Sequence, residues 1–130
     1  MSFFRDWLGV LGVGILAMAG IVGRGPAYDR TEISRVISSK LGGSIAMQRI
    51  EVPEGLVVTG RIVAYNTDKE PMALGVQSVD PSLVEVLSAS TDHGFSFVGR
   101  RHGQTSIELV VEGRRVMTIE AVVTPQPGAP

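Results

Sequence analysis

From residue 44 to residue 124 the chain consists of short segments in which apolar and polar residues alternate, and no other feature constrains the fold as much. Alternation of period two is typical of β-strands, because successive side chains point to opposite faces. Turn residues such as Pro-Glu-Gly at 53–55 separate the segments. Tight connections without intervening helices predict antiparallel sheets packed face to face. We therefore expect an all-β fold, an antiparallel β-sandwich of about seven strands, at 44–52, 56–65, 72–79, 83–88, 95–99, 105–111 and 115–124.

The same alternation predicts which side chains fill the space between the sheets. The segment at 44–52 is irregular, because Ile45 and Met47 share one parity whereas Ile50 and Val52 share the other. A bulge, or a strand that switches sheets, near residues 48–49 would reconcile the two sets. Elsewhere the expected inward residues are Val58, Ile62, Ala64, Leu74, Val76, Val84, Val86, Phe95, Phe97, Ile107, Leu109, Val111, Met117, Ile119, Ala121 and Val123.

The second half of the pattern resembles a bacterial immunoglobulin-like domain of the Big type. Residues 78–86 read SVDPSLVEV, Phe-Val-Gly at 97–99 precedes Gly-Gln-Thr-Ser-Ile at 103–107, and the last strand leads into Val-Thr-Pro at 123–125. The resemblance implies an immunoglobulin-like sandwich that works as an adhesive module. The same motifs are also similar to the small N-terminal domain of pilus-type secretins, although members of that family continue into a long barrel. The core tryptophan of many immunoglobulin-like domains is missing, since the sole tryptophan is Trp7.

An uncharged apolar run, LGVLGVGILAMAGIVG, occupies residues 8–23. Together with Trp7 it would cover about 25 Å of a hydrocarbon core about 30 Å thick as a helix, and its many glycines are typical of membrane helices. We interpret residues 1–23 as a transmembrane anchor. Two alternatives stay open: a secretory signal cleaved after Ala19, because Ala17-Met18-Ala19 fits the small-x-small pattern, and a hydrophobic helix buried in a protein assembly.

The charges that flank this run leave the membrane orientation open. Only Arg5 precedes it, whereas Arg24, Arg30, Arg35 and Lys40 follow it. The positive-inside rule therefore points the domain inward. The resemblance implies the opposite side, and we expect an extracytoplasmic domain, periplasmic or at the cell surface.

The sequence of residues 24–43 predicts a linker followed by a short amphipathic helix. Asp29 and Glu32 have the spacing of a capping box, and Gly42 would end the helix. An apolar stripe at helical spacing would give it one hydrophobic face, formed by Ile33, Val36, Ile37 and Leu41.

Neither the composition nor the motifs place side chains in a pattern that is typical of a catalytic or metal-binding site. The absence of cysteine excludes disulfides and zinc thiolate sites, and a net charge of −1 provides no uniform field for nucleic acid. His93 and His102 fall in predicted turns, and the acidic stretch 66–70 lacks the glycine and terminal glutamate of a calcium loop. The basic pairs at 100–101 and 114–115 are expected at opposite ends of one strand. We expect no enzyme, catalytic residue, cofactor, metal site, small-molecule ligand or nucleic-acid partner.

The expected function follows from these elements together. We expect a non-catalytic, membrane-anchored immunoglobulin-like module that contacts the membrane through residues 8–23 and acts through protein partners, as an accessory or structural component of an envelope assembly. Alternatives are a secreted carbohydrate- or cell-surface-binding module and a component of a pilus or secretion apparatus. The expected organisation is an anchor or signal at 1–23, a linker and helix at 24–43, a sandwich at 44–125 and a flexible tail at 126–130.

Overall fold

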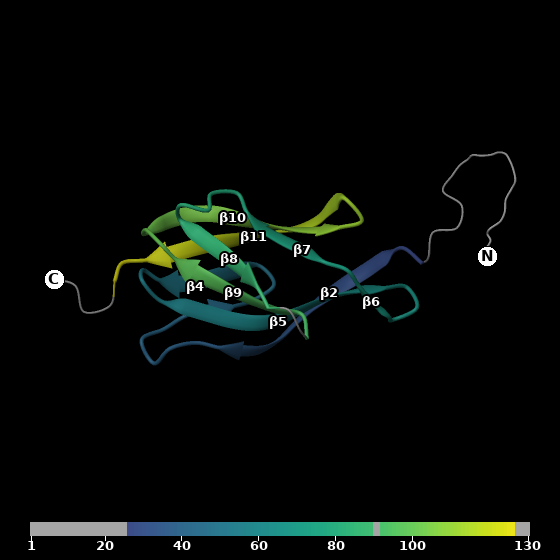
Figure 1. The fold of residues 1–130 in the computed structure, drawn as a ribbon, viewed down its shortest axis with the longest axis horizontal. Coiled ribbons are helices and arrows are strands. Elements are labelled where there is room, and N and C mark those ends of the chain that lie inside the picture. Colours follow the sequence, from purple (N-terminus) through teal and green to yellow (C-terminus); the bar gives the residue numbers. More distant parts are fainter. Residues whose placement is uncertain (1–25, 90–91, 127–130) are drawn as a thin grey trace, which may run out of the picture.

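A computed structural model describes residues 26–89 and 92–126, and every secondary-structure element within these ranges is a β-strand (Figure 1). No helix in these ranges is long and apolar enough to cross a membrane. The predicted anchor at 1–23 and most of the predicted tail lie outside the described residues. The strands are β2 (Tyr28–Ile37), β3 (Ser44–Ile45), β4 (Arg49–Pro53), β5 (Val57–Asn66), β6 (Pro71–Met72), β7 (Gly75–Ser78), β8 (Val84–Ser88), β9 (Gly94–Gly99), β10 (Gly103–Val111) and β11 (Arg114–Thr124).

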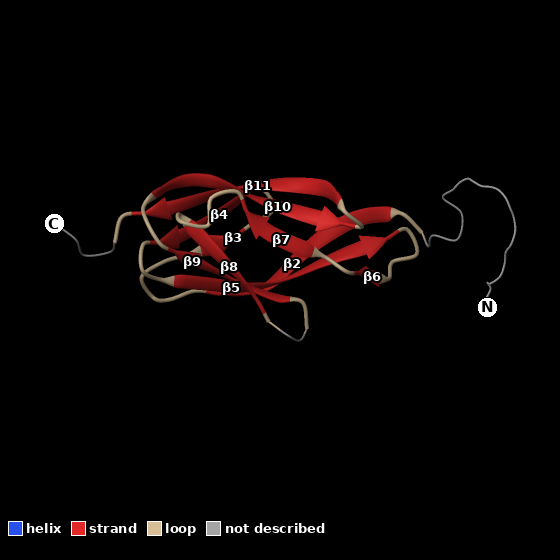
Figure 2. Ribbon diagram, turned by 45° about the horizontal axis from the view of Figure 1, so that its top comes forward, coloured by secondary structure: helices blue, strands red, loops and turns tan. Residues whose placement is uncertain are grey.

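The strands form two sheets that face each other (Figure 2). The first sheet has the order β3-β4-β11-β10-β7, and the second sheet has the order β2-β5-β9-β8, with β6 also paired to β5. All pairings are antiparallel except that of β4 with β11, which is parallel. The all-β fold with two facing sheets, expected from the alternation, is confirmed.

One hydrophobic core joins the two sheets. Phe97 of the second sheet and Ile107 of the first sheet are both fully buried in it. Every residue expected to point inward is either buried or packed against this core. Burial of one such side chain is worth about 1.5–3 kcal/mol, so the shared core is the main source of cohesion between the sheets.

The predicted bulge or sheet switch near residues 48–49 is wrong, because a hairpin occupies this segment. Strands β3 and β4 are antiparallel, and Ile45 lies opposite Ile50. Ala46 and Arg49 close the turn with two backbone hydrogen bonds, at 2.9 and 3.3 Å. The reversal of the chain brings Ile45 and Ile50 to the same buried face, which explains the change of parity.

The predicted amphipathic helix is also wrong for the described part of residues 24–43, since Tyr28–Ile37 is the strand β2. Strand β2 pairs with β5 over most of its length, so the sandwich begins at Tyr28 and not at residue 44. Thr31 and Ile33 face the core with period two. A short isolated helix is marginal in water, and β-branched residues beside a long partner strand favour the sheet.

The segment expected as one strand at 72–79 is divided between the sheets. Strand β6 pairs with β5 in the second sheet, whereas β7 pairs with β10 in the first. The chain therefore crosses from one layer to the other between Met72 and Gly75.

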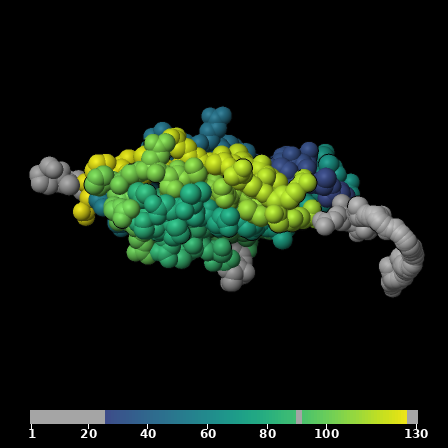
Figure 3. Space-filling model, turned by 90° about the horizontal axis from the view of Figure 1, so that it is seen from above, coloured from purple at the N-terminus to yellow at the C-terminus, as the bar shows by residue number. Residues whose placement is uncertain are grey.

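The described chain enters the sandwich at one end and leaves it at the other. The space-filling view shows an elongated molecule, with the first described residues in purple at one end and the last in yellow at the opposite end (Figure 3). The last strand, β11, is not an edge strand, because it lies between β4 and β10.

Candidate functional site

Each sheet has an outer face that points away from the core, and the two faces differ in chemistry. The first outer face, over β4, β11, β10 and β7, carries charged and amide side chains. The second outer face, over β2, β5, β9 and β8, carries aliphatic and hydroxyl side chains beside a group of charges.

The first outer face is crossed by ion pairs. Arg49 donates from Nε to Glu51 at 2.7 Å and from Nη1 to Glu120 at 3.2 Å, and Glu120 also accepts a hydrogen bond from Gln104. Since Arg49 lies on β4 and Glu120 on β11, one of these contacts links strands that are parallel neighbours.

Glu108 on β10 forms a second group on this face. It accepts hydrogen bonds from Arg115 on β11 at 3.0 Å and from Gln77 on β7 at 3.3 Å. These contacts, above all the one from Arg115, hold the pKa of Glu108 below its ordinary value. Such a face keeps its polar groups paired while it stays in contact with water.

The second outer face contains two neighbouring cross-strand rows. One row runs Ile37, Thr59, Ser96 and Leu87 across β2, β5, β9 and β8, and the next runs Val57, Val98 and Glu85. Three large aliphatic side chains in these rows are exposed to solvent: Ile37 at 68%, Val57 at 44% and Leu87 at 48%.

The polar groups within the first of these rows satisfy each other. The hydroxyls of Thr59 and Ser96 are hydrogen-bonded at 2.9 Å. Removal of water from this part of the face would therefore not leave these two hydroxyls without a partner. We define the aliphatic-hydroxyl patch as the residues Ile37, Val57, Thr59, Leu87, Ser96 and Val98.

Charged groups lie along the border of the patch. Asp92 accepts hydrogen bonds from Arg35 and from Arg61, both at 3.1 Å. The contact with Arg61 contributes most to lowering the pKa of Asp92. At the other border, Glu85 is paired with Arg100. Arg35 sits in a bulge of β2 with φ of 52°, which is an uncommon conformation for a residue other than glycine.

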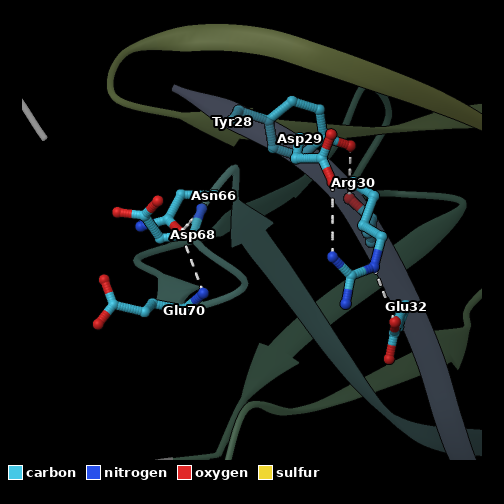
Figure 4. A network of polar contacts seen from close by, with 8 residues as sticks. Tyr28, Asp29, Arg30, Glu32, Asn66, Asp68 and Glu70 are labelled. Carbon is cyan, nitrogen blue, oxygen red and sulfur yellow. Dashed lines mark hydrogen bonds and ion pairs between the residues drawn. The ribbon is translucent and has the colours of Figure 1, made fainter. Parts of the chain in front are cut away.

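The two carboxylates predicted to cap a helix serve one arginine instead. Figure 4 shows Arg30 between Asp29, at 3.5 Å, and Glu32, at 2.9 Å. The Arg30 guanidinium also lies over the Tyr65 ring, 4.5 Å from its centroid. This cluster joins β2 to β5 on the second outer face, beyond the aliphatic-hydroxyl patch.

The structure places both histidines in turns, as expected. His93 lies between β8 and β9, and His102 lies between β9 and β10. His102 Nδ1 is 3.8 Å from Glu54 Oε1, and the imidazole is two-thirds exposed. Residues 26–89 and 92–126 contain no group of three or more side chains arranged to hold a metal ion.

The stretch 66–70 is a turn stabilised by its own asparagine. Asn66 is nearly buried, and its Oδ1 accepts hydrogen bonds from the backbone N–H groups of Asp68, at 2.9 Å, and Glu70, at 3.0 Å. Figure 4 shows the carboxylates of Asp68 and Glu70 directed away from Asn66. The interpretation of this stretch as a turn is confirmed.

The two basic pairs lie at opposite ends of β10, as predicted. Gly103 at the start of β10 pairs with Val123, whereas Val111 at its end pairs with Arg114. Sequence reasoning missed the aliphatic-hydroxyl patch and the contacts of Asp92. The outward positions of 56–65, 83–88 and 95–99 already carried a signal for the patch, because several are aliphatic or hydroxyl residues. No local signal linked Asp92 to Arg35.

These features define an all-β module of two facing sheets. No protein-family model matches the chain, and no curated protein does. Its fold is similar to solved structures of the S-layer protein SbsC. Domains 4 and 5 give a TM-score of 0.55 at 12% identity, covering 77% of this chain and 54% of that one.

Two further SbsC structures are similar to this chain. Domains 1–6 give a TM-score of 0.58 at 13% identity, and the match covers 82% of this chain and 14% of that one. Domains 5–6 give a TM-score of 0.55 at 14% identity, and the match covers 82% of this chain and 47% of that one. The chain thus spans about half the length of the two-domain structures. At these identities the likeness shows the fold.

Proposed function

We propose that the chain is a non-catalytic, immunoglobulin-like structural module of a cell-envelope assembly, held at a membrane through residues 8–23. The observation that carries the proposal is the similarity of its fold to domains of the S-layer protein SbsC. Because an S-layer is the surface layer of a cell, this similarity supports an extracytoplasmic position for the module.

The strand order supports the immunoglobulin-like assignment. In the constant-type immunoglobulin sandwich one sheet has the order ABED and the other contains CFG. The second sheet here, β2-β5-β9-β8, corresponds to ABED, and β7, β10 and β11 correspond to C, F and G. Strand β4 adds a parallel neighbour to the last strand.

The shape of the module supports a structural role. The described chain enters the sandwich at one end and leaves it at the other (Figure 1). Segments joined to its two ends would therefore be separated by the full length of the sandwich. Contact with partner proteins would use the outer faces, since the space between the sheets is filled by the core.

Fractionation of cells that produce the full chain tests the membrane part of the proposal. We expect the chain in the membrane fraction with an intact mass that includes residues 1–19. Leu16→Arg places a charge in the apolar run, at a cost of about 2.5–3.5 kcal/mol at the centre of a membrane helix, and should move the chain to the soluble fraction. Leu16→Val is the matched control and should stay in the membrane.

Crosslinking of the same membrane fraction tests the assembly part. Envelope proteins, or further copies of the chain, should be recovered with it. A soluble chain that crosslinks to nothing would overturn the proposal, and a mature N-terminus at Gly20 would replace the anchored module by a secreted one.

A further inference from the structure

We propose that one long side of the sandwich lies against an anionic lipid surface and forms a second membrane contact beside residues 8–23. Strands β2 and β3 form this side, because they are the end strands of the two sheets and contact each other. The side chains of Val36 and Ile45 meet over Gly60, where a Cβ would lie 3.6 and 2.9 Å from them. We name the exposed residues of 35–49 the β2/β3 edge. The inference rests on the proposed function, because residues 8–23 would bring the module to the membrane.

Exposed apolar side chains are concentrated on the β2/β3 edge. Of the seven large hydrophobic residues exposed in the described part of the chain, four belong to it: Val36, Ile37, Leu41 and Met47. Ile37 ends β2, Leu41 lies in the loop before β3, and Met47 lies in the turn between β3 and β4. These side chains therefore come from the end of a strand and from two connections, and not from the middle of a sheet.

The charges of this edge are all positive. From residue 33 to residue 50 the sequence contains Arg35, Lys40 and Arg49, and it contains no aspartate or glutamate. All three cations are exposed, although Arg35 and Arg49 are paired with carboxylates from outside this stretch. Apolar side chains beside cations are typical of segments that enter the headgroup region of a membrane. One lysine or arginine next to an anionic lipid surface strengthens binding about fivefold.

The opposite side of the sandwich, formed by β7 and β8, has exposed apolar residues with a different charge pattern. Val79 and Leu87 are exposed there. Residues 79–88 contain Asp80 and Glu85 and no lysine or arginine. An anionic lipid surface would therefore favour the β2/β3 edge over this side.

The point at which the chain enters the sandwich supports a bilayer as the occupant of the edge. Residues 24–27 join the run at 8–23 to the start of β2, and four residues span at most about 14 Å. Because β2 is the outermost strand of the second sheet, a sandwich that lies with β2 along the membrane brings the β2/β3 edge to the lipid. The carboxylates on the first half of β2, Asp29 and Glu32, are paired with Arg30 and add little repulsion.

The small number of apolar side chains also fits a bilayer better than a protein partner. A stable protein interface buries about 800 Å² on each partner. An interfacial membrane contact needs only a few inserted side chains when a tether already holds the module at the surface.

Single-cysteine variants of the full chain test the contact, because the chain contains no cysteine of its own. Leu41→Cys and Met47→Cys on the edge, and Val79→Cys and Leu87→Cys on the opposite side, are labelled with a fluorophore. Each chain is reconstituted into vesicles of phosphatidylcholine and phosphatidylserine, in which part of the lipid carries a quenching spin label. Quenching at the two edge sites should exceed that at the two control sites at least about threefold, because interfacial segments reach about 5–10 Å into the headgroup boundary.

Lys40→Glu tests the contribution of charge. The reversal should lower quenching at the Met47 site at least about twofold, as should vesicles of phosphatidylcholine alone, because the edge would lose its attraction to anionic lipid. Arg101→Glu is the matched control, since Arg101 is exposed and its side chain contacts Ser82, next to β8. It should leave quenching at the Met47 site unchanged.

Three outcomes would overturn the inference while the chain stays in the vesicles: equal quenching at edge and control sites, quenching at none of them, or quenching that depends neither on Lys40 nor on phosphatidylserine. Protection of the edge cysteines from an aqueous thiol reagent in native membranes, but not in these vesicles, would identify a protein as the occupant and would also overturn it. If the full chain does not enter the vesicles, the anchor of the proposed function fails first and the inference falls with it.

Discussion

The two outer faces of this sandwich are built on the same strand geometry and yet carry different chemistry. On the first outer face, Arg49 and Glu120 belong to one group of contacts and Glu108 to another, and each group spans three strands. On the second, Ile37 and Leu87 are open to solvent around a closed pair of hydroxyls. The inner faces show no such difference, because both contribute fully buried residues to one core.

The difference separates residues that specify the fold from residues that are free to do something else. Inward positions are constrained by packing, since a change of one methylene group is felt in a close-packed interior. Outward positions are constrained only by the strand conformation and by solubility. An exposed aliphatic group there is not needed for folding, which makes the second outer face the better candidate for contact with a partner.

The largest expected effect concerns the core that the two sheets share. Phe97→Ala in the second sheet should lower the free energy of unfolding by about 3–5 kcal/mol, and Ile107→Ala in the first by about 2–5 kcal/mol, because each leaves a cavity. Denaturant unfolding of the full chain in detergent measures both. Glu108→Ala, on the outer side of the same strand as Ile107, is the control and should cost much less than either core variant, because pairs between exposed charges contribute little to stability. An equal loss at Glu108 would refute the register.

A smaller effect is expected at Gly99, where the second sheet lies close to the backbone of the first. A Cβ on Gly99 would lie 2.7 Å from the carbonyl oxygen of Pro53 and 3.1 Å from a methyl group of Val123. Gly99→Ala should therefore destabilise the domain by about 1–3 kcal/mol, because backbone cannot yield cheaply. Gly75→Ala is the control, since its nearest neighbour would be at 3.7 Å. If the two alanine variants unfold at the same denaturant concentration, the close approach at Gly99 is not real.

Ser78 should show an effect of opposite sign. Its Oγ is buried and has no hydrogen-bond partner among the described residues. Ser78 lies on β7, opposite Ile107 of β10 in the first sheet. A buried hydroxyl without a partner costs free energy, so Ser78→Ala should leave stability unchanged or raise it by about 1 kcal/mol. A clear loss of stability in a urea melt would reveal a partner for this hydroxyl and would argue against the inward direction of its side chain.

The smallest effects are expected in the titration of two surface carboxylates, Glu108 on the first outer face and Asp92 at the border of the second. The pKa of Asp92 is lowered from its ordinary 3.8, first by the hydrogen bond from Arg61, and that of Glu108 from 4.5, first by the one from Arg115. Arg61→Gln should raise the pKa of Asp92 and leave that of Glu108 unchanged. Arg115→Gln should do the reverse. Carboxyl chemical shifts followed from pH 2 to 7 measure both values.

The sign of the accompanying pH dependence follows from the direction of these shifts. A carboxyl group whose pKa is lowered by folding stabilises the native state above its ordinary pKa. That contribution begins to fall near the ordinary pKa, 3.8 for Asp92 and 4.5 for Glu108, and is lost as the pH falls through the lowered value. A cross-effect of Arg61→Gln on Glu108 would mean that the outer faces are electrostatically coupled through the core.

The sequence predicted the inner half of this molecule well, because burial imposes the alternation that can be read directly. Every expected inward residue, from Val58 to Val123, reached the core or packed against it. The pairing of strands that are far apart in the sequence could not be predicted from this local pattern. Residues 28–37 have apolar side chains at helical spacing, but their β-branched side chains and the neighbouring β5 decided in favour of a strand. The tight hairpin at 46–49 is likewise too short to show an alternation of apolar and polar residues from which it could be predicted.

The surface contacts were less predictable still. Asp92 meets Arg35 across 57 positions of sequence, and Arg49 meets Glu120 across 71. Such partners depend on the strand order of both sheets, which the local pattern does not contain. The aliphatic-hydroxyl patch could have been found in part, by reading the outward positions as carefully as the inward ones.

The interior position of β11 has a consequence for how the protein is made. The last strand supplies the neighbour of both β4 and β10, so a ribosome that has not yet released Thr124 cannot have delivered a complete first sheet. Until then β4 and β10 each keep one edge unpaired, and the parallel pairing of β4 with β11 closes a loop of about seventy residues. Loops of this length slow folding and leave strand edges open to wrong partners. Formation of the first sheet therefore depends on the synthesis of β11 more than on that of any earlier strand.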